Sequence, residues 1–483
     1  MAVFVLAMAC KPARGPTLPS TGTTAATTNG RNSRAATRPG FPRGTVNIHD
    51  DNGGLTKFSS AARRLDTLAN ARERAWERLA WMADTYGHRM SGSQALEHAI
   101  MWAMETMARD GLENARREKV MVPHWVRGKE RARVVSPIER ELVLLGLGGT
   151  VGTGKRPLRA DIVVLTDVSE LDKKAAELKG KIVVINQKLP PYDAERRETG
   201  YGTTVKIRTQ GASMVAKHGA VAVLVRSVTA RSLRSPHTGI LQYASGVPKI
   251  PAAALAVEDT ELLVRMAARG PVTVELELGA KLLPDSPSAN VVAELPGREL
   301  RDEVVVIGGH IDSWDVGDGS TDDGAGCLMA MEAAAMLQEL GLVPRRTIRV
   351  VLFTGEENGG RGSQAYFENH GHEKHVAAIE ADLGSGAPHS FTVMGKPGDV
   401  DRLVGYLPLF KPFGVRIIES GYAGTDIMPL VETGTLGVGL RPDPSQYFDL
   451  HHSPADTVEK IDPRHLQDNA ASMALMAYIL AER

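Results

Sequence analysis

The chain has 483 residues, of which 42% are hydrophobic and 24% are charged, as in globular proteins of two or three domains. Its 57 Lys and Arg residues balance its 57 Asp and Glu residues, so the formal net charge is zero. This balance provides no general attraction to nucleic acids or to anionic membranes, and two cysteines cannot form a disulfide framework.

The first ten residues, MAVFVLAMAC, form a short apolar run that ends in small residues before Cys10. This pattern resembles a lipoprotein signal, but the basic start of such a signal is missing and the apolar part is short, so either the start is mis-set or this is no signal. Residues 11–42 are rich in Pro, Gly, Thr, Ser and Ala, which predicts a flexible tether. We therefore expect an extracytoplasmic protein that is secreted, periplasmic or anchored by a lipid at Cys10. No stretch of the sequence reaches the ~20 apolar residues of a membrane span.

Residues 43–127 begin the first domain, and the stretch SGSQALEHAIMWAMETMARDGL within them predicts a helix. Its apolar residues recur at steps of three and four, and Gly111 follows as a stop signal. These apolar residues are Leu96, Ile100, Met104 and Met107. Residues 128–282 then contain short strand-like runs, such as ELVLLGL, DIVVLTD and KIVVINQ, with few helical segments between them. They predict a separate β-rich domain with its own core.

Strand-like and helix-like segments alternate over residues 283–483. NVVAEL, EVVVIGG, TIRVVLFTG and VAAIEADLG read as buried strands, whereas GCLMAMEAAAMLQELG and HLQDNAASMALMAYILAER read as helices. Continuous Val and Ile runs between helices predict an α/β domain whose sheet is covered by helices on both faces. The helix-rich residues 43–127 are assigned to this same domain, so the β-rich domain is an insertion.

Acidic and histidine side chains follow the ends of three of these strands. His310 and Asp312 follow EVVVIGG, Glu356 and Glu357 follow TIRVVLFTG, and Asp382 follows VAAIEA. Because sites in α/β sheets form at the carboxyl ends of strands, we expect these groups to meet at one edge. Carboxylates without cations would repel and raise one another's pKa, and a divalent cation removes that conflict.

The number and type of these groups indicate which metal they bind. A mixed set of His and carboxylate ligands is typical of Zn²⁺, with Co²⁺ or Mn²⁺ as substitutes. Two further groups, Asp322-Asp323 and the His-His pair of YFDLHHSPADT, bring the number of ligands above four. A set of this size predicts two metal ions that share one bridging carboxylate.

Spacing also suggests two supporting roles. Adjacent side chains near a strand end point in different directions, so one of Glu356 and Glu357 can bind metal while the other acts as general base. Asp312 lies two residues after His310, where its carboxylate can orient the imidazole.

The motifs resemble those of the two-zinc exopeptidases, a family that includes bacterial aminopeptidases and carboxypeptidase Q. The resemblance covers residues 60–483 and rests on GGHIDSWDVGDGSTDDGAG, FTGEENGGRGS, IEADLG, GYAGTDIMPL and YFDLHHSPADT. HIDSWDVG, FDLHHSPADT and YGHRMSGSQALEHAIMWAMETM are most similar to the carboxypeptidase Q branch. The resemblance implies the zinc exopeptidase fold, a mixed sheet sandwiched by helices, with residues 128–282 as an inserted protease-associated domain.

The resemblance also implies a metal-binding role for five residues. His310 and Asp382 would bind one zinc ion, and Glu357 and His452 would bind the other. Asp322 would bridge the two ions.

The same resemblance implies the catalytic roles. Glu356 would be the general base, with Asp312 behind His310, and the peptide bond between Asp322 and Asp323 would be cis. Tyr422 in GYAGTD would steady the tetrahedral oxyanion. The ligand in the His-His pair is taken as His452 because the family pattern places it directly before Ser in HSPADT.

The implied function is a metal-dependent exopeptidase that hydrolyses dipeptides or short peptides with a zinc-activated water. The family also implies a homodimer. Whether the enzyme reads the amino or the carboxyl end of its substrate stays open. The alternatives are an aminopeptidase of the same family, a single-zinc glutaminyl cyclase, and a receptor-like binding protein without catalysis. The complete ligand set argues against the last of these.

Overall fold

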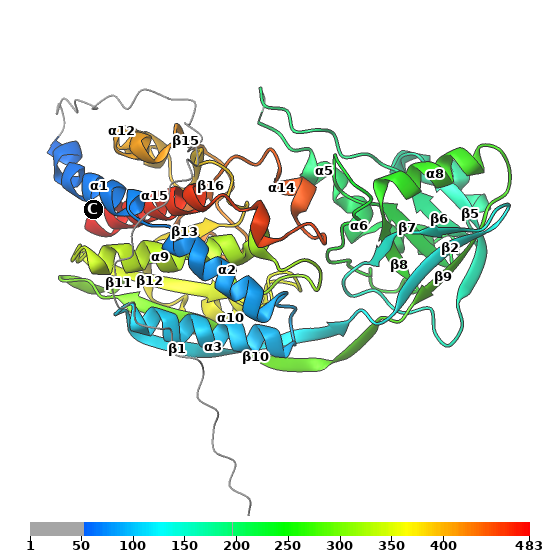
Figure 1. Ribbon diagram of the computed structural model, residues 1–483, viewed down its shortest axis with the longest axis horizontal. Helices are drawn as coiled ribbons and strands as arrows, with labels where there is room; N and C mark the ends of the chain where they lie inside the picture. Colours follow the sequence, from blue (N-terminus) through cyan, green and yellow to red (C-terminus); the bar gives the residue numbers. More distant parts are fainter. Residues whose placement is uncertain (1–52, 196) are drawn as a thin grey trace, which may run out of the picture. The chain divides into compact units, whose positions relative to one another are not determined.

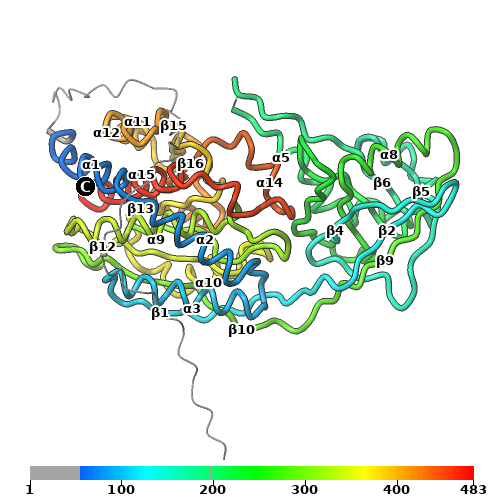
Figure 2. The backbone as a smooth tube through the Cα atoms, in the orientation of Figure 1, coloured from blue at the N-terminus to red at the C-terminus, as the bar shows by residue number. Residues whose placement is uncertain are grey.

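The computed structural model describes residues 53–195 and 197–483, which form two β-sheets with helices packed against them (Figures 1 and 2). The export signal, the tether and the lipid anchor at Cys10, predicted within residues 1–42, lie outside the described residues. Within the described part of the chain, no helix combines the length and the apolar character needed to cross a membrane.

The first sheet is mixed, which confirms the predicted α/β class with a mixed sheet. Its central strands pair in parallel, whereas the pairs at the first edge and one pair near the other edge are antiparallel. The eight strands lie in the order β1 (Glu113–Val126), β10 (Lys281–Leu295), β12 (Arg346–Phe353), β11 (Leu300–His310), β13 (Lys374–Ala381), β16 (Leu436–Arg441), β14 (Ser390–Met394) and β15 (Ile417–Ser420).

Helices cover both faces of this sheet because successive strand residues point to opposite sides (Figure 1). Val305 and Ile307 pack into a core shared with the helices α1 (Gly53–Asn70), α2 (Arg74–Tyr86), α3 (Gln94–Arg109), α9 (Ala325–Glu339) and α15 (Pro463–Glu482). Val304 and Val306 pack on the other face, with α10 (Arg361–His370) and α13 (Met428–Val431). The helix α9 is buried on almost every side, which explains why its sequence is apolar around its whole circumference.

The second sheet consists of strands that all fall between β1 and β10 in the chain. It builds cores on both of its faces: Val183 and Ile185 pack toward α7 (Gly211–Ala216), and Ile182 and Val184 toward α8 (Val257–Ala267). Its eight strands lie in the order β3 (Arg140–Leu142), β2 (Glu130–Ser136), β9 (Thr273–Leu278), β5 (Leu158–Leu165), β6 (Ile182–Ile185), β7 (Ala222–Arg226), β8 (Ala252–Leu255) and β4 (Leu144–Gly146).

Short helices connect the strands in both parts of the chain. They are α4 (Leu171–Lys174), α5 (Tyr201–Thr204), α6 (Lys206–Thr209), α11 (Asp399–Val404), α12 (Leu407–Phe410) and α14 (Tyr447–Leu450).

Two predicted strands differ from the structure. ELVLLGL is divided into β3 and β4 because Val143 leaves the ladder: its N–H donates to Asp259 Oδ2 at 2.7 Å and its carbonyl accepts from the Ala256 N–H at 2.9 Å. NVVAEL is only the second half of β10, because this strand pairs with β1 from Lys281 onward. In Figure 2 the chain follows β1 away from the first sheet and returns along β10.

The carboxyl ends of β11, β12 and β13 lie side by side. His310 pairs with Phe353 in one parallel ladder, and Gly308 pairs with Glu380 in the other. His310, the turn after Phe353 and the residue that follows β13 therefore meet at one edge of the sheet, as α/β geometry predicts.

Candidate metal centre

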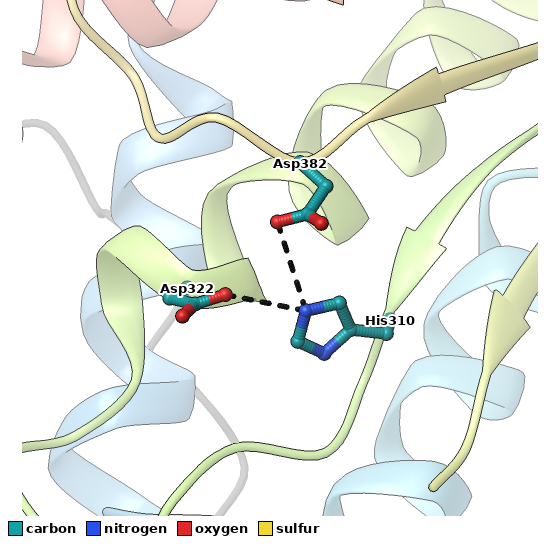
Figure 3. Close-up of side chains that lie close together, drawn as sticks. All are labelled: His310, Asp322 and Asp382. Atoms are coloured by element: carbon teal, nitrogen blue, oxygen red, sulfur yellow. Dashed lines mark ion pairs between the residues drawn. The ribbon is translucent and has the colours of Figure 1, made fainter. Parts of the chain in front are cut away.

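Five of the side chains singled out in the sequence form two adjoining groups. In the first, His310 Nε2 lies 3.2 Å from Asp322 Oδ1 and 3.7 Å from Asp382 Oδ1. Figure 3 shows the His310 ring, at the end of β11, pointing toward both carboxylates. In the second, His452 Nε2 lies 3.1 Å from Asp322 Oδ2 and 3.1 Å from Glu357 Oε2. Asp322 thus belongs to both groups and presents one oxygen to each.

Local backbone features bring these residues together. Asp322 lies just before α9, and its peptide bond to Asp323 is cis, which confirms that prediction. Glu357 lies in the turn after β12, where Gly355 has a φ of +71°, a conformation that favours glycine. His452 has a φ of 61°, which is uncommon for a residue with a side chain and is typical of functional sites.

The orientation of His310 differs from the prediction. Its Nδ1 lies 3.0 Å from the main-chain carbonyl oxygen of Asp312, whereas the nearest carboxylate oxygen of Asp312 is 3.8 Å away. That carboxylate accepts instead from the Glu356 N–H at 3.1 Å and from the Ser91 hydroxyl at 3.4 Å. Asp312 therefore orients the imidazole through its main chain, and its side chain fixes the turn that carries Glu356.

Arg89, in YGHRMSG, supports the centre although sequence reasoning did not find it. Its fully buried guanidinium donates to the carbonyl oxygens of Ile311 at 2.7 Å, Asp318 at 2.7 Å and Gly319 at 2.8 Å. All three carbonyls belong to the loop that joins the first histidine to the shared aspartate. Its position inside YGHRMSGSQALEHAIMWAMETM, a motif that carries the family resemblance, could have identified it, although the contact itself joins segments more than 200 residues apart.

Two more residues hold the ligands in place. Asp456 accepts from the main-chain N–H groups of Thr321 at 2.6 Å and Asp322 at 3.1 Å, and burial raises its pKa to about 7. The Trp314 indole N–H donates to Glu357 Oε2 at 2.5 Å. Both residues lie inside motifs that carry the family resemblance, HIDSWDVG and HSPADT, and this position is the signal that could have identified them.

Glu356 is partly buried beside Glu357 and belongs to neither group of ligand atoms. Burial raises the pKa of its carboxyl well above the usual value, and the negative charges of Glu357 and Asp426 act in the same direction. Asp426 is itself buried, and neither of its carboxylate oxygens has a hydrogen-bond partner among the described residues. A carboxyl with a raised pKa can hold a proton near neutral pH, as a general base must do briefly.

Tyr422, the predicted oxyanion donor, and two further acids of GGHIDSWDVGDGSTDDGAG lie in different surroundings. Tyr422 is 53% exposed, and its hydroxyl donates to the Thr425 hydroxyl at 3.1 Å rather than to a group of the centre. Asp315 forms an ion pair with Arg127 at 2.5 Å. Asp318 accepts from two main-chain N–H groups, each at 3.0 Å, and so has a structural role.

The charge and burial of the two groups fit divalent cations. Asp322, Glu357 and both histidines are buried; Glu357 Oε1 has no hydrogen-bond partner in the described part of the chain, and Asp322 Oδ2 faces only the His452 imidazole. Carboxylate oxygens in such surroundings are costly unless a cation compensates them. Imidazole nitrogens together with carboxylate oxygens are the donors that zinc prefers.

Comparison with known proteins agrees with this chemistry. The model of "Peptidase family M28" matches residues 290–477. Carboxypeptidase Q from Mus musculus is 41% identical over 434 residues, which are 89% of this chain and 90% of that protein. Carboxypeptidase Q from Homo sapiens is 40% identical over 421 residues, 86% of this chain and 87% of that protein.

Solved structures give the same result. The crystal structure of a peptidase M28 precursor from Shewanella amazonensis SB2B has a TM-score of 0.85 and 34% identity, covering 89% of this chain and 97% of that one. A zinc aminopeptidase from Bacillus subtilis has a TM-score of 0.64 at 19% identity, covers 84% of this chain and 95% of that one, and supports the fold alone. The chain therefore belongs to peptidase family M28 and is a zinc metallopeptidase, as its motifs predicted.

Proposed function

We propose that this exopeptidase hydrolyses dipeptides or short peptides and that its centre holds two zinc ions. The observation that carries the proposal is the position of Asp322, whose two oxygens face two separate groups of ligand atoms. The high identity to proteins named carboxypeptidase Q supports a carboxypeptidase or dipeptidase rather than an aminopeptidase.

The five residues would divide between the two ions. His310 and Asp382 would hold one ion, Glu357 and His452 would hold the other, and Asp322 would be shared by both. When bound, zinc supplies Lewis acidity toward water and toward the scissile carbonyl, and Co²⁺ or Mn²⁺ can replace it.

The chain's own residues then supply proton transfer and positioning. Glu356 takes a proton from the attacking water at its carboxylate and passes it to the leaving amine. Asp312 accepts from the Glu356 N–H at 3.1 Å and so keeps the base in the turn beside the ligands. The Trp314 indole N–H donates to Glu357 Oε2 and so holds this carboxylate in place. The Tyr422 side chain is exposed, and its hydroxyl donates to the Thr425 hydroxyl. Tyr422 is our candidate donor to the tetrahedral oxyanion.

Dipeptide hydrolysis and metal content test this proposal together. We expect a chelator to abolish hydrolysis and two equivalents of zinc to restore it; a stoichiometry of one zinc per chain would instead favour a single-zinc cyclase. Glu356→Gln should keep its zinc and its melting temperature but lose about 10²- to 10⁴-fold in kcat. Glu368→Gln, which changes an exposed glutamate, is the control and should behave as wild type. Normal turnover by Glu356→Gln would contradict the assignment of the base.

We also assign the rest of the chain. The β-rich part between β1 and β10 is proposed to be a protease-associated domain spanning residues 128–282, with residues 43–127 and 283–483 as the catalytic domain. Its position in the chain and its separate sheet support this assignment. An extracytoplasmic location and a homodimer stay predictions, to be tested by fractionation and by light scattering.

A further inference from the structure

Arg208, on α6, is a buried cation without a carboxylate partner. Arg208 is only 6% exposed, and it forms no ion pair with any of the described residues. Its contacts are a hydrogen bond from Nη1 to His452 Nδ1 at 3.0 Å and a longer one from Nη1 to the Thr238 carbonyl oxygen at 3.4 Å. Its Nε has no hydrogen-bond partner within the described part of the chain. A buried charge is costly unless an opposite charge compensates it.

The other buried arginines of the described chain have their charge or their donors satisfied. Arg226 forms an ion pair with Glu261 at 2.7 Å. Arg349 forms ion pairs with two glutamates, at 2.8 and 2.7 Å. Arg89 donates to the loop carbonyls described above. Arg208 therefore differs from them in lacking an anion, and it is also the one that touches a ligand of the proposed metal centre.

The surroundings of Arg208 hold its guanidinium at the centre. Its Cζ lies 5.7 Å from the ring centroid of Tyr201, which itself stacks on Phe448 with centroids 4.3 Å apart. On another side, a Cβ on Gly239 would lie 2.4 Å from Arg208 Nη1 and 2.6 Å from His452 Nδ1. Only a residue without a side chain fits there, so the fold makes room for the contact between guanidinium and imidazole.

His452 places Arg208 beside the centre. His452 Nε2 faces the two carboxylates of its group, so it is the nitrogen that would bind metal. Arg208 Nη1 and the Thr238 carbonyl oxygen both lie on the other, Nδ1 side of the ring, at 3.0 and 3.3 Å. The polar partners of the guanidinium are therefore an imidazole and a carbonyl oxygen, and neither carries a negative charge.

We propose that Arg208 binds the free α-carboxylate of the peptide substrate and so makes the enzyme selective for the carboxyl end. A guanidinium presents paired N–H donors that match both oxygens of a carboxylate, and the substrate would supply the anion that the fold does not. The inference rests on the proposed peptidase function and deepens it. Arg208 lies on a short helix of the inserted β-rich part, which thereby contributes a specificity residue to the centre.

The test compares alanyl-alanine with alanyl-alaninamide, which differ only in the charge at the carboxyl end. With zinc-loaded wild type, we expect kcat/KM for the free dipeptide to exceed that for the amide by about 10- to 100-fold. Arg208→Met should remove most of this ratio by lowering kcat/KM for the free dipeptide while changing that for the amide less than about threefold. Arg208→Lys keeps the positive charge but lacks the planar guanidinium, so its ratio of kcat/KM values should lie between those of wild type and Arg208→Met. This variant serves as the test if Arg208→Met is unstable.

Binding without turnover provides a second readout. In the Glu356→Gln background, titration calorimetry should give a Kd for the free dipeptide about 10- to 100-fold below that for the amide, and adding Arg208→Met should equalise the two. Zinc content and melting temperature are measured on every variant. Arg226→Met is the matched control, because it removes another buried guanidinium of the second sheet and should leave the ratio unchanged.

Each alternative result has one meaning. Equal losses for both substrates in Arg208→Met would show a structural or oxyanion role and overturn the inference. An unchanged ratio in that variant, or no preference for the free dipeptide in wild type, would also overturn it. If wild type hydrolyses neither compound in a metal-dependent manner, the proposed function itself fails, and the calorimetric comparison still decides whether Arg208 reads a carboxylate.

Discussion

Replacing Trp314 with Phe should weaken one of the two proposed metal positions and spare the other. The Trp314 residue is 2% exposed and donates to Glu357 Oε2 at 2.5 Å, while its ring contacts Trp125 and His452 with centroids 6.5 and 5.8 Å away. Phe keeps an aromatic ring but removes the N–H donor. A hydrogen bond to a charged group contributes about 1.5–3 kcal/mol, so we expect zinc affinity at the Glu357 position to fall about 10- to 100-fold.

Competition with a chromophoric chelator measures this loss directly. As free zinc is lowered, the Trp314→Phe variant should release its first ion well before its second, whereas wild type should release the two over a narrower range. Trp102→Phe is the control, since Trp102 stacks on Trp81 in the helical part of the chain, away from the ligands. Unchanged zinc affinity in Trp314→Phe, or equal weakening of both positions, would refute the reasoning that this hydrogen bond holds a single ligand.

Three other predictions concern the groups around the centre and one remote cluster. The lysine in Arg89→Lys cannot donate to all three loop carbonyls, so the free energy of unfolding should fall by about 2–3 kcal/mol and the zinc content should also fall. Urea titration measures the first quantity and mass spectrometry the second. A fall in unfolding free energy of less than about 0.5 kcal/mol would contradict this prediction. Asp322→Asn should lower zinc content toward zero, whereas Asp382→Asn should retain about one ion; equal stoichiometry in the two variants would disprove the bridging role. Hydrogen bonds and charge from Glu118, opposed by partial burial, raise the pKa of His370 above its usual value. The stabilisation from protonated His370 is therefore complete below its unfolded pKa of about 6.5 and is lost as pH rises through the folded pKa. We expect His370→Gln to lower the free energy of unfolding by about 1–2 kcal/mol at pH 6 and by much less at pH 9. A pH-independent difference in urea unfolding would argue against this charge.

The sequence predicts best where one local rule decides the outcome. EVVVIGG and TIRVVLFTG are apolar runs followed by polar groups, and they became the neighbouring parallel strands β11 and β12. The helix over GCLMAMEAAAMLQELG followed from its continuous apolar composition, which only a helix buried on all sides can accommodate. The convergence of His310 and Asp382 followed from the parallel sheet alone.

Contacts between distant segments could not be predicted in this way. Arg89 and Arg208 look like ordinary basic residues in the sequence, yet each ends beside the centre through contacts over more than 200 positions. Asp312 shows a subtler limit: the spacing to His310 was informative, but the main-chain carbonyl and not the carboxylate meets the imidazole. Spacing shows which residues are near one another, whereas the choice of atom depends on the backbone path.

The paired strands β1 and β10 have a consequence for how the chain can be redesigned. Val126, the last residue of β1, pairs directly with Lys281, the first residue of β10, and the whole second sheet is contained between these two positions. The connecting segments pass so close that a Cβ on Gly128 would lie 2.6 Å from the Gly279 carbonyl oxygen. Because the two ends are already adjacent, the intervening segment can be lengthened, shortened or exchanged without moving the strands that carry the proposed metal ligands. A short turn between Val126 and Lys281 could therefore replace the whole intervening part, and the proposed carboxylate contact of Arg208 would be lost with it.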